Sequence, residues 1–289
     1  MKQNISGKLL QAQPYIDKEI KRLSNMVKDL NITPTLVIVK VGNDRASERY
    51  VKNKVNMGKK VGITTIVQQF DEHTQEQELI DYIKYVNTND DIHGCLVQLP
   101  LPNHINETNI LNALDPKKDV DGFHSQHLGK LVKGEDCIVS CTPKGIIDLL
   151  DFYDIDIEGK KVVILNRSNI VGKPLIHLML QRNATVCVCH SKTSYSVRMN
   201  EIMTADIIIT AVGKPKFLRY WNIPFGKTIV DVSINVDEDG KLCGDLDKDC
   251  YEDLIREGCN ITPVPGGIGP MTVLSLMKNV IKACLLNIK

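Results

Sequence analysis

Tyr50 and Lys54 are the first candidates for a catalytic or binding role. They lie in the segment 46–58, which has no proline and no internal glycine before Gly58, so we expect a helix that ends near that glycine. Residues four positions apart lie one above the other on the same helical face. An aromatic ring able to stack on a flat ligand would then lie beside an ammonium group able to give or take a proton. Taken alone, the pair is more simply explained as a solvated aromatic–cation pair, because such pairs are common.

The elements that must position this pair are alternating strands and helices. Short apolar runs predict buried strands, and apolar positions at helical spacing predict helices between them. The predicted strands are 35–39, 63–67 and 94–97, and the predicted helices, besides 46–58, are 6–30 and 76–86. This alternation predicts a parallel α/β sheet, in which ligands bind at the carboxyl ends of the strands.

Three more polar side chains in this half are candidates. Gln98 follows the third predicted strand, and it serves either a site or the loop backbone. Asp119 and Asp121, in the run KDVDG, could form only a turn, and they do not match a calcium-binding loop.

The second half repeats the alternation. Strands are predicted at 159–165, 184–189, 206–210 and 228–232. Helices are predicted at 142–150, from after Pro174 to about residue 180, and at 195–203. The polar loop between the first strand and its helix is typical of a nucleotide-binding turn, although it lacks the G-x-G-x-x-G pattern. The repeated units predict a Rossmann-type domain. A rigid, sharply turned loop is predicted at 261–272 by its prolines and glycines, followed by an apolar helix to residue 286.

Composition narrows the class of protein. The 289 residues are 43% hydrophobic and 25% charged, which is ordinary for a globular protein of about two domains. The net charge of +1 gives no electrostatic case for nucleic acid as a partner. We expect no membrane span, because no apolar run approaches the required length, and no metal site, because no ligand spacing is present. Nine scattered cysteines indicate free thiols in a reducing cytoplasm.

Several motifs coincide in order along the chain: Y-x-x-x-K at Tyr50 and Lys54, VQLPLP at 97–102, KDVDG at 118–122, RSxxVGxP at 167–174, CHSKT at 189–193 and PVPGGIGPMT at 263–272. Together they resemble the bifunctional methylenetetrahydrofolate dehydrogenase/methenyltetrahydrofolate cyclohydrolase family over nearly the whole chain. The resemblance implies a two-domain α/β fold with a cleft between the domains. A folate-binding catalytic domain would occupy residues 1–140, with a final helix at 271–289 packing back on it, and a Rossmann-type NAD(P)-binding domain would occupy 141–270.

The resemblance also implies two reactions on tetrahydrofolate derivatives in one-carbon metabolism, by a cytoplasmic homodimer. A hydride would pass from 5,10-methylenetetrahydrofolate to NADP, and water would open the resulting methenyl cation to 10-formyltetrahydrofolate. Tyr50 would stack on the aminobenzoyl ring, Lys54 would manage protons with Gln98 hydrogen-bonded to it, and Asp121 would accept hydrogen bonds from the pterin. Further substrate contacts are implied for Val97, Leu99, Pro100, Pro265, Gly266 and Gly267. Cofactor contacts are implied for Asn166, Arg167, Ser168, Val171, Gly172, Pro174, His190, Ser191, Lys192, Ala211, Val212, Gly213, Ile234, Gly267 and Thr272.

Two features of the predicted cofactor site bear on which cofactor binds and how its phosphates are held. Arg167 can hold a 2′-phosphate bidentately with Ser191 as a neutral donor, and no carboxylate follows the second strand, so NADP is expected rather than NAD. The family usually has glycine where this chain has Asn166. Asparagine tolerates a positive φ, so the turn survives, but its side chain either crowds the phosphate or donates to it. We expect crowding.

Two other classes stay open. A different two-domain Rossmann dehydrogenase, acting on a hydroxy or amino acid, would lack the folate loop and the Tyr–Lys pair. A catalytically silent nucleotide-binding protein would be expected to have lost Lys54, Gln98 or Asp121, and all three are present.

Overall fold

The computed structural model describes residues 6–287 and divides the chain into two compact units. The three-stranded unit holds Asp17–Cys141 and the residues from Val273 onward. The five-stranded unit holds the residues up to Ile16 and Thr142–Thr272. Each unit has its own parallel sheet and its own hydrophobic core. The domain limits at residues 140 and 270 stay a prediction.

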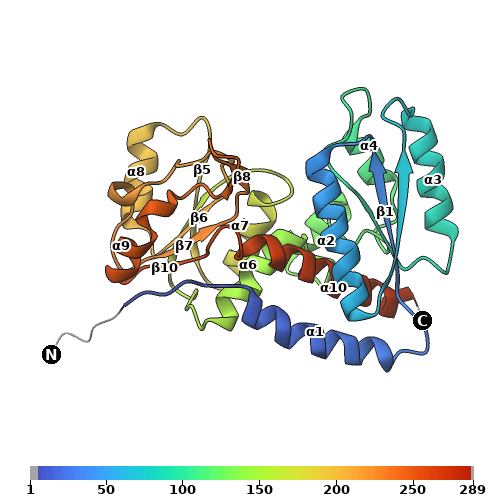
Figure 1. Ribbon diagram of the computed structural model, residues 1–289, viewed down its shortest axis with the longest axis horizontal. Coiled ribbons are helices and arrows are strands. Elements are labelled where there is room, and N and C mark those ends of the chain that lie inside the picture. The colour runs from blue at the N-terminus through green and yellow to red at the C-terminus, as the bar shows by residue number, and fades with distance from the viewer. Residues whose placement is uncertain (1–5, 288–289) are drawn as a thin grey trace. The chain divides into compact units, whose positions relative to one another are not determined.

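In the three-stranded unit the strand order is β2-β1-β3 and all pairings are parallel. β1 is buried from its second residue onward because it lies between its two neighbours and beneath helices on both faces (Figure 1). One face packs its valines, such as Val37 and Val39, against Leu79 and Ile83 of α3. The elements are α1 (Gln13–Lys28), β1 (Thr35–Val41), α2 (Arg45–Val61), β2 (Thr64–Phe70), α3 (Glu76–Thr88), β3 (Gly94–Val97), α4 (Glu107–Ala113) and α5 (Ser125–Lys133).

The helix that carries Tyr50 and Lys54 is α2. It begins after Asp44, whose carboxylate accepts a hydrogen bond from the Ser47 amide at 2.7 Å, and it ends at Gly62 with φ of 93°. The prediction that it ends near Gly58 is wrong. A Cβ at Gly58 would lie 2.5 Å from Thr65 Oγ1, so glycine at this position allows the helix to pack closely on β2.

The predicted helix at 6–30 is also wrong in its first turns. Residues before Gln13 run extended beside β10: Leu10 N donates to Ile261 O at 2.8 Å, and Ile261 N donates to Lys8 O at 3.0 Å. Leu9 and Leu10 fit the helical spacing by coincidence. Leu10 is fully buried in this extended segment, so its apolar character serves a sheet edge instead of a helical face.

In the five-stranded unit the strand order is β10-β7-β6-β4-β5, all parallel. The chain moves from β4 to one neighbour and then crosses to the other, so the strand order reverses between β4 and β6. That switch point is where open α/β sheets bind ligands. The elements are α6 (Cys141–Phe152), β4 (Lys161–Leu165), α7 (Gly172–Gln181), β5 (Thr185–Cys189), α8 (Tyr195–Thr204), β6 (Ile207–Thr210), η1 (Tyr220–Asn222), β7 (Thr228–Asp231), β8 (Asn235–Val236), β9 (Leu242–Cys243), η2 (Lys248–Cys250), α9 (Tyr251–Arg256), β10 (Asn260–Ile261) and α10 (Ile268–Asn287).

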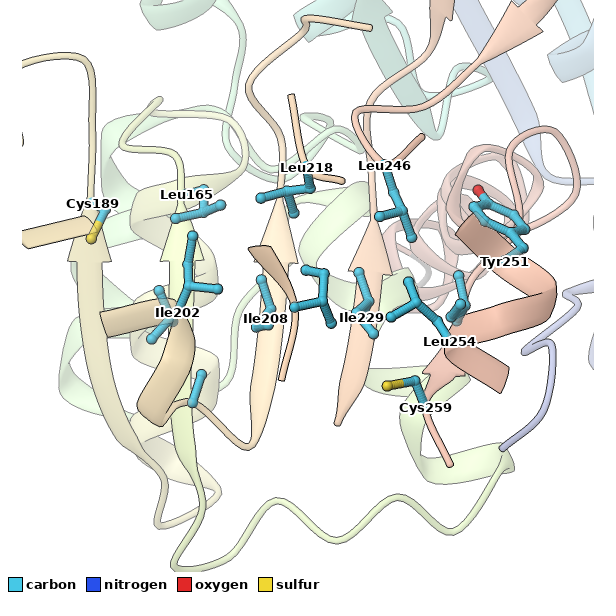
Figure 2. Packing of buried hydrophobic residues seen from close by; sticks show 14 residues of the cluster. Leu165, Cys189, Ile202, Ile208, Leu218, Ile229, Leu246, Tyr251, Leu254 and Cys259 are labelled. Carbon is cyan, nitrogen blue, oxygen red and sulfur yellow. The ribbon is translucent and has the colours of Figure 1, made fainter. Parts of the chain in front are cut away.

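One face of this sheet forms the main core of the unit. Figure 2 shows Ile208 and Ile229 side by side on the neighbouring strands β6 and β7, with Ile202 of α8 and Leu254 of α9 on either side of them. Leu165 of β4 lies further toward the carboxyl end of its strand. Ile202, Ile208, Ile229 and Leu254 are fully buried and Leu165 nearly so. Truncating such a residue to alanine costs about 2–5 kcal/mol, so this layer fixes the strands whose carboxyl ends form the ligand edge.

α10 contradicts the expectation that no apolar run approaches the length of a membrane span. Within the described residues, this one helix is long and apolar enough to cross a bilayer, and 67% of its apolar 18-residue stretch is buried inside the protein. Two polar side chains in it have partners in the three-stranded unit: Lys278 pairs with Glu19 at 3.0 Å, and Asn279 donates to the carbonyls of Val120 and Val139. Length and composition alone are weak evidence for a span, because a buried core helix meets the same criteria.

Candidate active site

Gln98 and Lys54 meet at the carboxyl edge of the three-stranded sheet. The Gln98 amide donates to Val39 O at 2.8 Å, which continues the pairing of β3 with β1 and fixes the residue beside the switch point of this sheet. Its side-chain oxygen accepts a hydrogen bond from Lys54 Nζ at 3.0 Å, and its side-chain nitrogen donates to Leu99 O at 2.8 Å. The second bond orients the amide so that its oxygen faces the ammonium group. The expected contact between these two residues is therefore present.

Tyr50 lies one turn before Lys54 on α2 and is half-buried. Burial raises the pKa of its phenol, and the positive charge of Arg49 opposes the rise. The hydroxyl is therefore protonated at neutral pH, and the ring presents a neutral, polarisable face.

Asp121 reaches the same edge through a segment that pairs with β3. Cys95 N donates to Lys118 O at 2.7 Å and Val120 N donates to Cys95 O at 3.3 Å, so residues 118–120 run parallel beside the strand. The neighbouring Asp119 is the turn former: its carboxylate accepts from the amides of Gly122 and His124. Burial raises the Asp119 pKa to about 6. The sequence did not distinguish the two aspartates. In the structure, Asp119 holds the turn, which leaves Asp121 as the candidate for the site.

Two residues that sequence reasoning missed hold Asp121. Cys141 Sγ lies 3.6 Å from Asp121 Oδ1, and Asn279 Nδ2 lies 3.5 Å from the same sulfur. Burial raises the Cys141 pKa well above the ordinary thiol value, so the thiol keeps its proton and has two hydrogen-bond acceptors within reach, Asp121 Oδ1 at 3.6 Å and Val120 O at 3.5 Å. The sequence offered one weak signal, since Asn279 is an uncharged polar residue within the predicted apolar helix, and the structure buries it.

The residues implied for the substrate fall in both units. Val97 is buried at the end of β3, and Leu99 and Pro100 follow Gln98 in the chain. Pro265, Gly266 and Gly267 lie in the five-stranded unit, in the turn before α10.

That turn needs its glycines for backbone reasons. Gly266 has φ of 108°, and its carbonyl accepts from Ala12 N at 2.9 Å. A Cβ on Gly267 would lie 2.7 Å from Pro263 O. The glycines therefore let the chain turn back on itself with its backbone segments in close contact.

In the nucleotide-binding turn, Asn166 joins the two loops at the switch point. Its side-chain nitrogen donates to Ala211 O at 2.6 Å, and its side-chain oxygen accepts from Ser168 N at 2.7 Å and Gly172 N at 3.0 Å. Asn166 does not take a positive φ, since the non-glycine residues with positive φ in the described chain are Asp154, Asn183 and Lys216. The hydrogen bonds of its side chain favour a role in fixing the turn. The crowding expectation stays a prediction.

The first amides of α7 are satisfied inside this turn. Besides Gly172, Val171 N donates to Ser168 Oγ at 3.1 Å and Lys173 N donates to Ser168 O at 2.9 Å. A Cβ on Gly172 would lie 2.5 Å from Asn166 O, so only glycine allows the helix to begin here. A phosphate at this end would therefore rely on the helix dipole and on side chains such as the exposed Arg167.

The Asn166→Gly variant tests this arrangement. We expect it to bind NADP about tenfold more weakly than the wild type, because three hydrogen bonds that fix the turn are lost. Calorimetric titration with NADP measures the difference. Asn169→Gly, an exposed change in the same loop, is the matched control and should leave the affinity unchanged. Equal or tighter binding by Asn166→Gly would restore the crowding explanation.

The loop after β5 carries the remaining cofactor candidates. His190 N donates to Thr193 Oγ1 at 2.9 Å and His190 Nδ1 accepts from Lys192 N at 3.2 Å, which closes a short turn. Ser191 and Lys192 are exposed at its tip. The loop therefore presents a hydroxyl and an ammonium group, without a carboxylate, at the carboxyl end of β5.

Of the other expected cofactor residues, Pro174 is buried in the first turn of α7, and Ile234 is 41% exposed just after β7. Thr272 Oγ1 lies 3.0 Å from Thr142 Oγ1, so the threonine pair joins the start of α6 to α10. Ala211, Val212 and Gly213 follow β6 at the switch point, and Gly213 is exposed.

Asp231, at the end of β7, is a buried carboxyl that sequence reasoning missed. It is 1% exposed, and burial raises its pKa to about 7. Hydrogen bonds from the amides of Leu246 and Ser233 lower the pKa, but by less than burial raises it. An unfolded aspartate titrates near about 4, so the folded chain binds the extra proton between pH 4 and 7. The free energy of unfolding should therefore fall as the pH rises through that window.

The Asp231→Asn variant removes this proton-linked contribution. Between pH 5 and pH 7 the wild type should lose about 2 to 3 kcal/mol of stability relative to the variant. Urea unfolding of both proteins at four pH values gives the difference, in which the other titrating groups cancel. Asp239→Asn, which changes an exposed aspartate, should run parallel to the wild type. Parallel curves for Asp231→Asn would show that Asp231 is ionised throughout.

Family models match both halves of the chain. The catalytic domain of tetrahydrofolate dehydrogenase/cyclohydrolase matches residues 5–121, and the NAD(P)-binding domain of the same family matches residues 140–287.

Relatives and solved structures extend the likeness over nearly the whole chain. The bifunctional protein FolD of Nautilia profundicola is 44% identical over 279 residues, 96% of each chain. The crystal structure of the Campylobacter jejuni enzyme, methylenetetrahydrofolate dehydrogenase/cyclohydrolase, superposes with a TM-score of 0.90 at 40% identity, covering 96% of this chain and 98% of that one. The Trypanosoma brucei dehydrogenase–cyclohydrolase, complexed with NADP and an inhibitor, gives a TM-score of 0.91 at 28% identity, covering 98% and 99%. The chain therefore belongs to the tetrahydrofolate dehydrogenase/cyclohydrolase family.

Proposed function

We propose that this enzyme oxidises 5,10-methylenetetrahydrofolate to the 5,10-methenyl cation with NADP and hydrolyses that cation to 10-formyltetrahydrofolate. The observation that carries the proposal is the hydrogen bond from Lys54 Nζ to Gln98 Oε1, at the carboxyl edge of a parallel sheet. Tyr50 lies one helical turn away, and Asp121 ends the segment beside β3. The bifunctional names of the relatives support the same pair of reactions.

The folate is held by stacking and by a fixed carboxylate. Tyr50 stacks on the aminobenzoyl ring, and its neutral phenol costs less to desolvate than a phenolate. Asp121 accepts hydrogen bonds from the pterin, and the Cys141 thiol holds that carboxylate in one orientation. Val97, Leu99 and Pro100 shape the wall beside Gln98 in the three-stranded unit. Positioning of this kind lowers the barrier for both reactions.

Lys54 moves protons in the hydrolysis. Water that attacks the methenyl carbon must lose a proton, and the ring nitrogen that leaves must gain one. An amine can serve both steps in turn. Gln98 accepts from Lys54 Nζ without adding the negative charge that a carboxylate would bring, so it orients the ammonium group and leaves proton release possible.

The cofactor residues fit a dinucleotide at the switch point of the five-stranded sheet. Asn166, Ser168, Val171, Gly172 and Pro174 shape the first turn. Arg167, His190, Ser191 and Lys192 supply donors for the phosphate groups. Ala211, Val212, Gly213, Ile234, Gly267 and Thr272 line the remaining part of the site. When bound, NADP supplies the acceptor for the hydride.

A purified-protein assay tests the proposal. The enzyme is given methylenetetrahydrofolate with NADP or with NAD, and NAD(P)H formation and methenyl absorbance are followed separately. We expect reduction of NADP and, in a separate reaction, hydrolysis of preformed methenyltetrahydrofolate without any nucleotide. Activity on a hydroxy or amino acid, with none on the folates, would favour a different dehydrogenase.

We further propose a homodimer in a reducing cytoplasm. β2 is an edge strand of its sheet, its sequence TTIVQQF carries no charge or proline, and Ile66 and Val67 are 43% and 42% exposed. Such an edge pairs readily with a second copy. All nine cysteines are free, which suits a reducing compartment.

Charge placed on this edge should weaken the dimer. The double variant Ile66→Lys with Val67→Lys is expected to sediment as a monomer at concentrations where the wild type is dimeric, because like charges would face each other across the twofold axis. Ile32→Lys, at a residue 38% exposed elsewhere in the same unit, is the control and should remain dimeric. A dimeric double variant would place the interface on another surface.

A further inference from the structure

We propose that Asp245 is a positioning residue that fixes the backbone after β6 for the nicotinamide end of the cofactor. The proposal rests on the proposed NADP-dependent function. Asp245 is fully buried, yet its carboxylate accepts hydrogen bonds from six donors. Half of these donors are three successive backbone amides of the loop that follows β6: Val212, Gly213 and Lys214, at 2.7, 3.0 and 2.9 Å.

The side-chain donors tie the same carboxylate to the sheet. Thr210 Oγ1 at the end of β6 and Ser233 Oγ after β7 donate to Oδ2 at 2.7 and 2.8 Å, and Asn235 Nδ2 donates to Oδ1 at 3.1 Å. Ser233 Oγ also accepts from Gly213 N at 3.0 Å. A buried carboxylate with this many donors is well compensated, and removing it would leave several amides unsatisfied.

The segment that carries Asp245 is itself anchored on both sides. Leu246 N donates to Asp231 Oδ2 at 2.7 Å, and a Cβ on Gly244 would lie 2.0 Å from the same oxygen, so only glycine allows this approach. Leu218 N donates to Asp245 O at 3.0 Å, and Asp247 N donates to Leu218 O at 2.8 Å. The carboxylate therefore has a fixed position from which to order the loop.

The direction of the amides decides what the loop offers to a ligand. The N–H and C=O of a trans peptide point in opposite directions. Because the amides of Gly213 and Lys214 point inward to Asp245, the carbonyls of Val212 and Gly213 point away from it. The preceding carbonyl, that of Ala211, is taken by Asn166 Nδ2. The loop thus presents two carbonyl oxygens at the switch point, which suit a ligand group with N–H donors, such as the carboxamide of a nicotinamide ring.

Asp245→Asn tests the role, because it replaces one acceptor oxygen by a donor at nearly constant volume. We expect the KM for NADP to rise about tenfold or more, since at least one inward amide loses its partner. Hydrolysis of methenyltetrahydrofolate uses no nucleotide and should keep its wild-type rate. Asp239→Asn, an exposed change in the same unit, is the control and should alter neither activity.

A second measurement separates loop positioning from general stability. The wild type should bind NADP several-fold more tightly than its 3-acetylpyridine analogue, which lacks the carboxamide N–H groups, and Asp245→Asn should reduce that ratio toward one. If Asp245→Asn does not fold, Ser233→Ala removes a single partner of the same carboxylate and should move both readouts in the same direction by a smaller factor. An unchanged KM and an unchanged ratio in a wild type that reduces NADP would overturn the proposal. A wild type inactive toward NADP would instead refute the proposed function.

Discussion

The Lys54→Met variant should lose methenyl hydrolysis by about a hundred- to ten-thousandfold, whereas reduction of NADP should fall far less. Hydride transfer requires the two ligands in alignment, and the folate nitrogen supplies the electron push. Hydrolysis requires a group to take and return protons. Methionine keeps the apolar stem of the lysine and removes the ammonium group that binds Gln98 Oε1, so the fold and the stacking on Tyr50 should persist.

Other titratable groups near Asp121 are poorly suited to replace Lys54. The Cys141 thiol stays protonated because burial raises its pKa well above the ordinary value. Asp119 is 4% exposed and its carboxylate is committed to the amides of Gly122 and His124. The structure therefore gives no alternative base of comparable freedom among these groups.

The measurement pairs the two activities on one preparation, with folate binding as a further check. Lys52→Met removes an exposed lysine from the same helix and should leave both activities intact. Lys54→Arg keeps the positive charge but cannot release a proton, so it should resemble Lys54→Met in hydrolysis. Near wild-type hydrolysis in Lys54→Met, or an equal fall of both activities with binding intact, would refute the assignment.

The strands were the most predictable part of the fold. Gly94–Val97 was predicted at the residues that the structure gives, because a fully buried strand appears as a continuous apolar run. The other principal strands were placed to within a few residues, including the partly exposed edge strands β2 and β5. The same logic failed for short elements. α5, Ser125–Lys133, was not among the predicted helices, because its two buried residues, His127 and Leu131, make only one apolar pair at helical spacing. β10 has two residues and no pattern to detect.

The errors at Gly58 and Leu10 have a common physical cause. A glycine ends a helix when it takes a left-handed conformation, as Gly62 does, but it can also lie inside a helix where another segment packs closely. An apolar residue at helical spacing can serve an extended segment when its partner is a distant strand, as Ile261 is for Leu10. Both outcomes depend on tertiary contacts that local spacing does not contain.

The candidate site likewise contains residues that the sequence predicted and residues that only the structure revealed. Residues proposed to act on a ligand, such as Lys54 and Gln98, stand in short motifs because their chemistry restricts their type. Residues that contact other parts of the candidate site, such as Cys141 beside Asp121 and Asp245 beneath the loop after β6, are ordinary in type and become recognisable only when distant segments are brought together. Asn166 shows most clearly what the sequence could not predict. Its role in the turn depends on which groups its side-chain amide contacts, and these partners are known only from the structure.

Arg167→Gln should reduce the preference for NADP over NAD by about tenfold to a hundredfold, through weaker binding of NADP and little change for NAD. A guanidinium group can hold a 2′-phosphate with two charge-assisted hydrogen bonds, and NAD has no group at that place. Arg167 is exposed in the turn after β4, and Ser191 and Lys192 are exposed in the loop after β5. The loop at 190–193 contains no carboxylate that would compete for the phosphate.

Ser191→Asp should act in the same direction, because a carboxylate at the end of the second strand favours the free ribose hydroxyl and repels the phosphate. Steady-state kinetics with both cofactors give the ratio, and Arg256→Gln, which removes an exposed arginine of α9, should leave it unchanged. A wild type more efficient with NAD than with NADP, or a ratio unaffected in both variants, would assign the selectivity to residues outside these two loops.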